Sequence, residues 1–149
     1  MREFLQNREV FRGLSDASIQ RIAEAIEEVS LPVDTSLFRE GEPADALYII
    51  RAGSVRVMKQ LPAGGEALVI AHLPAGTVIG ERGVLDGTVR VASVVTDTPS
   101  VFWKLRRSTV QALAATDPLL RSRVHALVLA RGHLPPTRDL PPEGDAGIE

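Results

Sequence analysis

The chain has 149 residues and a formal net charge of −2, with 44% hydrophobic and 24% charged residues. This length and composition predict one soluble globular domain with its own core. The nearly balanced charge, with no basic run longer than Arg106-Arg107, argues against an electrostatic nucleic-acid surface. The sequence contains no cysteine, which excludes disulfides, thiolate metal sites and cysteine nucleophiles. No apolar run is long enough to span a membrane and the amino terminus lacks a signal-peptide core, so we expect a cytoplasmic protein.

The first 28 residues predict helices. Apolar residues scattered over 4–14 indicate a short helix that ends near Gly13. Ser15 fits an N-cap, and apolar residues at helical spacing continue to about Glu28. This helix must end before Pro32.

Residues 29–105 change to short apolar or alternating runs that are separated by Gly, Pro and Asp turns. Regularly spaced short strands predict a sandwich or barrel. One short helix, 81–85, interrupts them and is a place where function tends to concentrate. The expected strands are 29–33, 36–39, 46–51, 54–60, 66–73, 77–79, 90–96 and 100–105.

Residues 108–131 return to helix. Ser108 and Gln111 fit a capping box, and Asp117-Pro118 fits the N-cap and first position of a second helix that stops at Gly132. The domain is therefore expected to occupy residues 1–132. Residues 133–149 are rich in Pro, Gly and acid and predict a disordered tail.

The segment 78–94, V-I-G-E-R-G-V-L-D-G-T-V-R-V-A-S-V, carries the chemistry. Glu81 and Arg90 are opposite charges beside Gly80 and Gly83, where backbone can approach a ligand closely. An anion could rest on the amides at the start of the short helix while Arg90 binds it. The alternative is a surface salt bridge between the two charges, which would contribute little.

Two motifs together carry a family resemblance. The segment 37–57, L-F-R-E-G-E-P-A-D-A-L-Y-I-I-R-A-G-S-V-R-V, and the segment 78–94 resemble the two signatures of cyclic-nucleotide-binding domains. These domains occur in catabolite-activator-type transcription factors, in regulatory subunits of cyclic-AMP-dependent kinase and in nucleotide-gated channels. The resemblance covers about residues 14–130. It implies a mainly β fold: an eight-stranded double-stranded β-helix, or jelly-roll-like β-roll, with N-terminal helices, a short phosphate-cassette helix and C-terminal lid helices.

The resemblance also implies a ligand, cyclic AMP or cyclic GMP, and no further cofactor. Glu81 would accept a hydrogen bond from the ribose 2′-hydroxyl, and Arg90 would pair with the cyclic phosphate. Gly41 and Gly53 match structural glycines of the β-roll. The ligand-binding residues carried over or placed beside the phosphate are Gly80, Glu81, Arg82, Gly83, Arg90, Val91 and Ala92.

Two positions depart from the family pattern. Arg82 stands where the family usually has an apolar residue, so the site could bind anions more strongly or could have changed its ligand. Val91 stands where cyclic-GMP-selective members often have Thr, which favours cyclic AMP because valine has no hydroxyl for the guanine.

The resemblance implies a lid as well. The segment 118–131 is the candidate, with Leu120, Arg123, Val124 and Leu127 as residues that could face the base. The same apolar stripe could instead belong to the core or to a homodimer seam.

Features that the sequence lacks limit its downstream partners and its alternative functions. No helix-turn-helix follows the lid segment, so we expect no DNA binding by this chain alone and a protein partner downstream. No catalytic constellation is present, so we expect no enzyme, and His72 alone cannot build the metal site of a cupin. The main alternative is a degenerate β-roll that has lost its ligand and serves as a protein-interaction scaffold.

Overall fold

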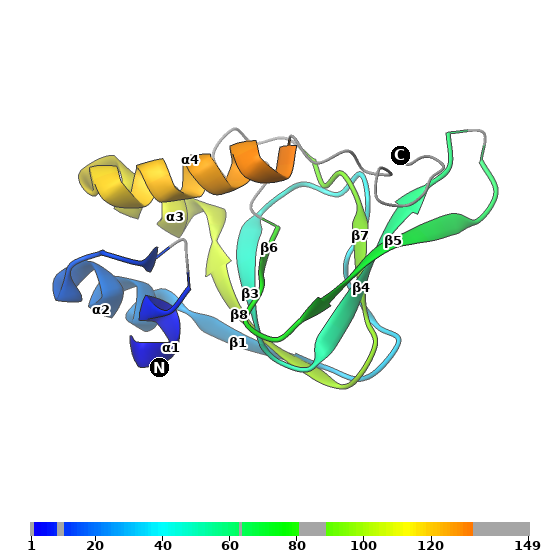
Figure 1. Ribbon diagram of the computed structural model, residues 1–149, viewed down its shortest axis with the longest axis horizontal. Helices are drawn as coiled ribbons and strands as arrows, with labels where there is room; N and C mark the ends of the chain where they lie inside the picture. The colour runs from blue at the N-terminus through cyan, green and yellow to red at the C-terminus, as the bar shows by residue number, and fades with distance from the viewer. Residues whose placement is uncertain (1, 9–10, 63, 81–88, 133–149) are drawn as a thin grey trace.

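Eight strands and four helices make up the part of the chain that the computed structural model describes, residues 2–8, 11–62, 64–80 and 89–132. The helices are α1 (Arg2–Gln6), α2 (Asp16–Ala25), α3 (Arg107–Thr116) and α4 (Pro118–Gly132). The strands are β1 (Glu27–Leu31), β2 (Ser36–Phe38), β3 (Ala46–Ala52), β4 (Ser54–Gln60), β5 (Ala67–Pro74), β6 (Val78–Ile79), β7 (Ser93–Thr96) and β8 (Ser100–Arg106). Figure 1 shows the helices gathered at one side of the strands.

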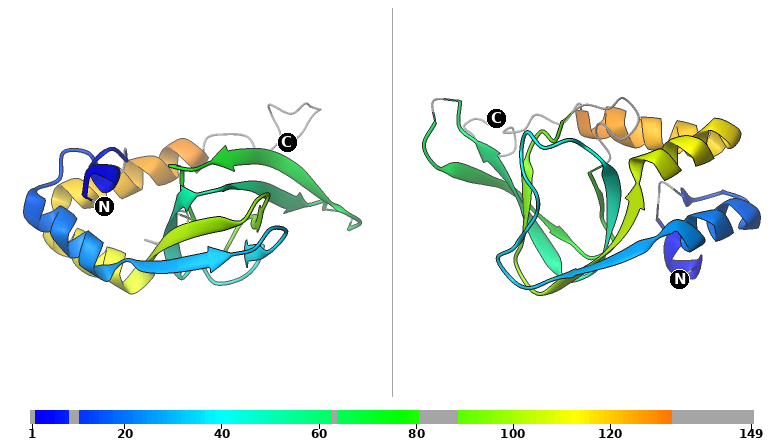
Figure 2. Two further views of the ribbon diagram at one scale, coloured as in Figure 1. Left: turned by 90° about the horizontal axis from the view of Figure 1, so that it is seen from below. Right: turned by 180° about the vertical axis from the view of Figure 1, so that it is seen from behind.

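The strands form two four-stranded antiparallel sheets. The first has the order β1-β8-β3-β6 and lies against the helices, and the second has the order β2-β7-β4-β5. The two further views in Figure 2 show the sheets enclosing a common interior, with the β4–β5 hairpin projecting away from the helices. The predicted fold class, mainly β with flanking helices, is confirmed.

Strand β3 is the centre of the core because both of its faces are covered. All five residues from Ala46 to Ile50 are buried. Leu47 and Ile49 join a helical cluster with α2, α3 and α4, whereas Tyr48 and Ile50 join a second cluster between the sheets. A strand buried on both faces needs a continuous apolar run rather than an alternating one, as this sequence has.

The predicted cap of α2 is confirmed, but its predicted end is wrong. Ser15 Oγ accepts a hydrogen bond from the amide of Ser18, 3.2 Å away. The helix ends at Ala25 rather than near Glu28, and β1 already begins at Glu27. The reason is tertiary: Glu27 and Glu28 pair with Lys104 and Trp103 of β8, which local periodicity cannot reveal.

The starts of two further elements differ from the prediction. Helix α3 begins at Arg107, so Ser108 lies inside it, and its N-cap Arg106 makes no side-chain cap bond. The carbonyl of Asp45 instead accepts from the amide of Arg107 at 2.8 Å, which satisfies the first free amide of the helix. Strand β7 begins at Ser93, so Arg90 precedes it rather than opening it. In contrast, Asp117 caps α4 as predicted, since its Oδ1 accepts from the amide of Leu120.

Gly53 shows why the turn between β3 and β4 requires glycine. Its φ is 93°, a conformation that residues with a side chain rarely adopt. A Cβ there would also lie 2.3 Å from Ser100 Oγ and 2.7 Å from the carbonyl oxygen of Pro99. The structural role predicted for Gly53 is therefore confirmed.

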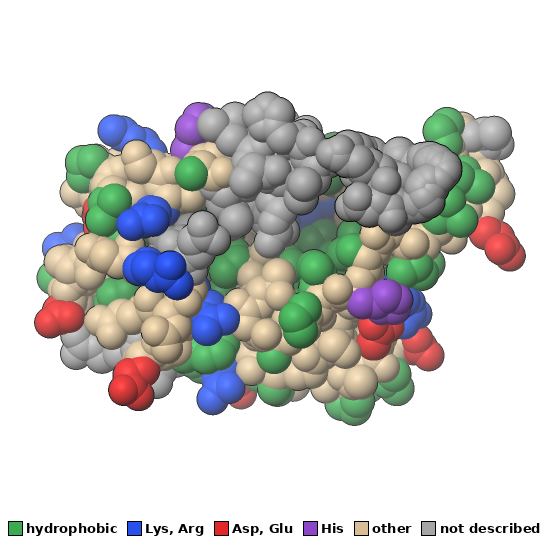
Figure 3. All heavy atoms as spheres, viewed as in Figure 1, with side chains coloured by type: hydrophobic (Ala, Val, Ile, Leu, Met, Phe, Trp, Pro, Cys, Tyr) green, Lys and Arg blue, Asp and Glu red, His purple; other side chains and the backbone are tan. Residues whose placement is uncertain are grey.

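The surface is mixed in character. On the face shown in Figure 3, Lys and Arg side chains gather mainly over the helical side, and hydrophobic side chains show on the projecting hairpin. Leu68 and Val69 of that hairpin are 49% and 45% exposed. Within the described part of the chain, no helix is long and apolar enough to cross a bilayer.

An ionic network at the second sheet links four side chains, two on strands β4 and β5 and two in the connecting turns. Arg56 of β4 donates to Asp97 Oδ1 at 3.0 Å and to Asp34 Oδ1 at 2.8 Å. Asp97 Oδ2 lies 2.8 Å from His72 Nδ1 of β5. The hydrogen bonds from His72 and then Arg56 lower the pKa of the Asp97 carboxyl below its ordinary value.

The Asp97 contacts should make stability depend on acid pH. A carboxyl with a lowered pKa in the folded state stabilises the fold fully above its ordinary pKa of about 4, and this contribution is lost as the pH falls through the folded value. Asp97→Asn should therefore lower the free energy of unfolding at neutral pH, and its difference from the natural protein should shrink in acid. Urea denaturation at both pH values measures this. Glu66→Gln, at an exposed carboxylate of the β4–β5 hairpin, is the control. A loss of stability in Asp97→Asn that is equal at both pH values would contradict the prediction.

Candidate functional site

Arg90 is a buried cation at the junction of the two sheets. Its side chain is 2% exposed, although the segment that carries it lies outside any named strand. Arg90 Nη1 donates to the carbonyl oxygen of Gly80 at 2.9 Å, and Nη2 donates to the carbonyl oxygen of Ala46 at 2.8 Å. Asp45 Oδ1 lies 3.5 Å from Nη2 and supplies an opposite charge. The guanidinium is thus held in one orientation, as a buried charge must be.

Aromatic rings complete the environment of this cation. The Arg90 guanidinium carbon lies 4.0 Å from the ring centroid of Phe38 and 5.8 Å from that of Tyr48. Such stacking is favourable for arginine and leaves the edge of the guanidinium plane for hydrogen bonds. Burial, followed by the nearby Asp45 charge, raises the pKa of the Tyr48 hydroxyl. Tyr48 therefore stays neutral beside the cation at physiological pH.

Gly80 makes the close approach of Arg90 possible. Its φ is 76°, and a Cβ at this position would lie 2.7 Å from Arg90 Nη1 and 3.2 Å from the carbonyl oxygen of Ala46. A side chain here would displace the guanidinium or the start of β3. From the sequence we expected the backbone at Gly80 to approach a ligand. In the structure this backbone approaches the side chain of Arg90 instead.

The main chain of Arg90 is clamped by the turn after β2. The amide of Gly41 donates to the Arg90 carbonyl at 2.9 Å, and the amide of Arg90 donates to the Glu42 carbonyl at 2.7 Å. An isolated antiparallel bridge between Pro43 and Val89 adjoins these bonds. The two segments whose sequences carried the family resemblance are therefore in direct contact.

A second set of contacts holds the residues that follow Arg90. Lys59 Nζ donates to the Val91 carbonyl at 2.6 Å. Glu40 Oε2 lies 3.4 Å from the same Nζ, and the amide of Glu40 donates to Ser93 Oγ at 2.8 Å. The short run from Arg90 to Ser93 is thus fixed from two sides.

The structure describes four of the seven predicted ligand-binding residues. Gly80 and Arg90 are in direct contact, and Val91 and Ala92 continue the chain from Arg90. The Val91 side chain is 42% exposed. Glu81, Arg82, Gly83 and the predicted helix 81–85 lie outside the described residues.

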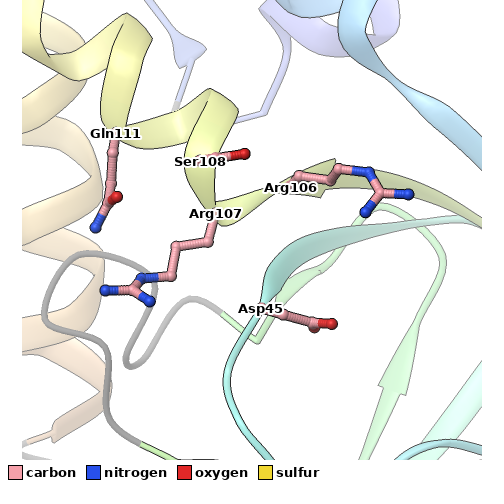
Figure 4. A pocket seen from close by; sticks show the side chains of 5 residues that line it. All are labelled: Asp45, Arg106, Arg107, Ser108 and Gln111. Carbon is pink, nitrogen blue, oxygen red and sulfur yellow. The ribbon is translucent and has the colours of Figure 1, made fainter.

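A cavity of about 290 Å³ adjoins this site at the start of α3. Figure 4 shows Arg106 and Arg107 pointing in opposite directions from the junction of β8 and α3. Arg106 pairs with Glu27 through two bonds of 2.6 and 3.0 Å. The cavity is lined by Asp45, Arg106, Arg107, Ser108 and Gln111.

The described part of the lid segment supports the core alternative. Leu120 and Val124 are each 1% exposed and belong to the helical cluster with α2 and the first sheet. In this conformation they do not face the site. The side chain of Leu127 lies outside the described residues, and Arg123 is partly buried.

Several contact residues of the site were not singled out from the sequence. Phe38 and Lys59 were assigned only to the expected strands 36–39 and 54–60, and Asp45 lies between two expected strands. Their partner Arg90 is distant in sequence, so periodicity and turn chemistry carry no signal for these contacts. Among the described residues no group of three or more His, Asp or Glu could hold a metal ion.

Comparison with known proteins assigns the family. The protein-family model described as cyclic nucleotide-binding domain matches residues 28–117 of this chain. A CRP-like cAMP-activated global transcriptional regulator of Mycobacterium tuberculosis is 30% identical over 131 residues, covering 88% of this chain and 58% of the regulator. An uncharacterized NTE family protein of the same organism is 32% identical over 121 residues, covering 81% of this chain and 20% of that protein. The chain thus spans between one fifth and three fifths of the length of these relatives.

Structural similarity agrees with the sequence match. The crystal structure of the catabolite activator protein of Thermus thermophilus superposes with a TM-score of 0.74 at 27% identity, covering 83% of this chain and 57% of that protein. The matched region contains both sheets and the clamped Arg90 segment. The chain is therefore a cyclic nucleotide-binding regulatory domain and belongs to the family of that name.

Proposed function

We propose that this domain binds cyclic AMP through Arg90. The observation that supports the proposal is the buried guanidinium, stacked on Phe38 and presented beside the backbone of Gly80. A cyclic phosphodiester carries one negative charge, and a guanidinium in a fixed orientation can donate to two of its oxygens.

Binding would work by exchange of hydrogen-bond partners. In the conformation described, Arg90 donates to the neutral carbonyls of Gly80 and Ala46. A phosphate anion forms stronger, charge-assisted bonds with the same group. The ligand would draw Arg90 toward itself and weaken its bond to the start of β3. A binding event of this kind can shift a conformational equilibrium.

The remaining predicted residues would surround the sugar and phosphate. Glu81 can only accept, which suits the ribose 2′-hydroxyl and not the phosphate. The amides around Gly80, Gly83, Val91 and Ala92 would complete the phosphate site. Arg82 would add a second cation beside it and strengthen anion binding.

We infer that the domain comprises residues 1–132 and signals through a protein partner or through a homodimer. Binding alone has no consequence unless another molecule reads the conformational change. A relative that is 30% identical is named as cAMP-activated, which supports cyclic AMP as the first ligand to test.

A second candidate function is the ligand-free scaffold. The observation that favours it is that Arg90 already has internal acceptors, the carbonyls of Gly80 and Ala46. A residue that stabilises the β-roll in this way could persist after ligand binding is lost. The scaffold would bind a protein partner equally well with and without cyclic nucleotide.

The first prediction about ligand binding concerns Arg90. Calorimetry of ligand-free protein should show binding of cyclic AMP at micromolar concentration or tighter. Arg90→Ala should abolish the heat because the phosphate loses its charge-assisted partner, and Arg90→Lys should weaken binding about tenfold or more because lysine cannot form the paired contact. Arg39→Ala, at an exposed arginine, is the control.

Stability must be measured on the same Arg90 variants. Arg90→Ala leaves two carbonyls without their donor and should lower the free energy of unfolding by about 1–3 kcal/mol. Titrations are therefore run well below the unfolding temperature of each variant. The absence of heat with cyclic AMP, cyclic GMP and cyclic di-GMP in the natural protein would refute the ligand-binding proposal.

The second prediction concerns Glu81 and the ribose. The natural protein should bind cyclic AMP about tenfold or more tightly than its 2′-deoxy analogue, because the analogue leaves a carboxylate without its donor. Glu81→Ala should weaken cyclic AMP binding and remove this discrimination, and Glu66→Ala should leave both affinities unchanged. Discrimination that survives in Glu81→Ala would show that another group binds the 2′-hydroxyl.

The third prediction concerns the choice of base at Val91. Val91→Thr should raise the affinity for cyclic GMP relative to cyclic AMP by about three- to tenfold, the effect of one hydrogen bond. Competition with a fluorescent nucleotide measures the ratio. Val91→Ala is the control because it shortens the side chain without adding a hydroxyl. An unchanged ratio in Val91→Thr would show that this position does not contact the base.

A further inference from the structure

We infer that Lys59 is a positioning residue that fixes the amide of Ala92 for the phosphate. The inference rests on the proposed function, because that function assigns the Ala92 amide to the phosphate site. Lys59 itself need not touch the ligand. It would act through the backbone that follows Arg90.

Lys59 reaches the segment from the neighbouring strand. Within the second sheet, Met58 of β4 pairs with Ser93, the first residue of β7. Lys59 lies one residue further along β4, beside the chain that leads from Arg90 into β7. Its Nζ donates to the Val91 carbonyl at 2.6 Å, a short distance that is typical of a charge-assisted hydrogen bond.

Glu40 holds the lysine in this orientation. Glu40 Oε2 lies 3.4 Å from Lys59 Nζ, and Oε1 accepts from the amide of Gln60 at 3.0 Å. The amide of Glu40 donates to Ser93 Oγ. Lys59 and Glu40 have side chains that are 36% and 32% exposed, so the pair is shielded but not desolvated. The Glu40 carboxylate therefore contacts two neighbouring residues of β4, and the Glu40 amide contacts Ser93 at the end of the segment that Lys59 holds.

Peptide geometry converts such carbonyl contacts into orientations for two amides. In a planar trans peptide the C=O and N–H groups point in opposite directions. The Val91 carbonyl points to Lys59, so the Ala92 N–H in the same peptide points away from it. The Arg90 carbonyl points to the amide of Gly41, so the Val91 N–H points away from that turn. The two amides are each fixed by a bond on the opposite side of their own peptide.

The positive charge of Lys59 also affects how strongly the Ala92 N–H donates, in addition to fixing its direction. A carbonyl that accepts a hydrogen bond from a cation is polarised, and the N–H of the same peptide becomes a stronger donor. Lys59 would therefore strengthen the bond from Ala92 to an anionic oxygen. A neutral side chain of similar length would fill the same space without this effect.

The test compares Lys59→Met with Lys104→Met. These are the two lysines of the chain, and Lys104 lies on β8 outside the contacts around Val91. The probes are cyclic AMP and its two phosphorothioate diastereomers, in which sulfur replaces one or the other exocyclic oxygen. Lys59→Met should weaken cyclic AMP binding about tenfold and change the affinity ratio of the diastereomers, since the loss falls on one oxygen more than the other. Lys59→Arg keeps the cation and should restore most of the cyclic AMP affinity and of the diastereomer ratio. Lys104→Met should change neither the affinity nor the ratio.

A second readout does not need the ligand. In ligand-free protein the amide NMR signal of Ala92 should shift in Lys59→Met and largely return in Lys59→Arg. Failure of the natural protein to bind nucleotide would overturn the proposed function, and with it the phosphate role of the Ala92 amide. Binding by Lys59→Met with unchanged affinity and diastereomer ratio would overturn the Lys59 inference alone. A uniform loss for all three nucleotides together with a lower unfolding temperature would also overturn it, because that pattern is general destabilisation.

Discussion

Burying a charged guanidinium between two sheets lowers the stability of the fold unless the surrounding groups supply hydrogen-bond acceptors or an opposite charge. Arg90 meets that requirement with two carbonyl acceptors, Ala46 in β3 of the first sheet and Gly80 directly after β6, and with the Phe38 ring from the second sheet. The cation therefore joins the two sheets at the end where the candidate site lies. Its position explains why glycine is needed at residue 80. The features that would bind a ligand are the same features that hold the β-roll together.

The backbone around Arg90 is fixed as firmly as its side chain. The turn after β2 bonds to both the amide and the carbonyl of Arg90, and Lys59 bonds to the next carbonyl. A segment with no regular secondary structure thereby acquires a single conformation. Such a constraint would let consecutive amides bind one anion, since each N–H direction is set by the bond on the other side of its peptide.

Local chemistry predicted much of the fold, and tertiary contacts decided where it failed. The caps at Ser15 and Asp117 and the strand Ser54–Gln60 depend on neighbours in sequence and agree with the structure. The end of α2, the start of α3 and the start of β7 depend on β8, Asp45 and the turn after β2, and these boundaries were wrong. The site divides in the same way. A motif identified Arg90, but its contacts with Phe38 and the Lys59 contact with Val91 join distant segments that no single-sequence pattern connects.

Asp45 connects the Arg90 segment directly to the carboxyl-terminal helices. Its carboxylate lies 3.5 Å from Arg90 Nη2, and its carbonyl accepts from the first amide of α3 at 2.8 Å. A ligand that draws Arg90 away would remove the opposite charge from Asp45, the residue that holds the start of α3. Helix α4 follows α3 directly, and its Leu120 and Val124 belong to the same buried cluster as residues of α2 and the first sheet. Asp45 is therefore the residue through which a displacement of Arg90 would act on the start of α3.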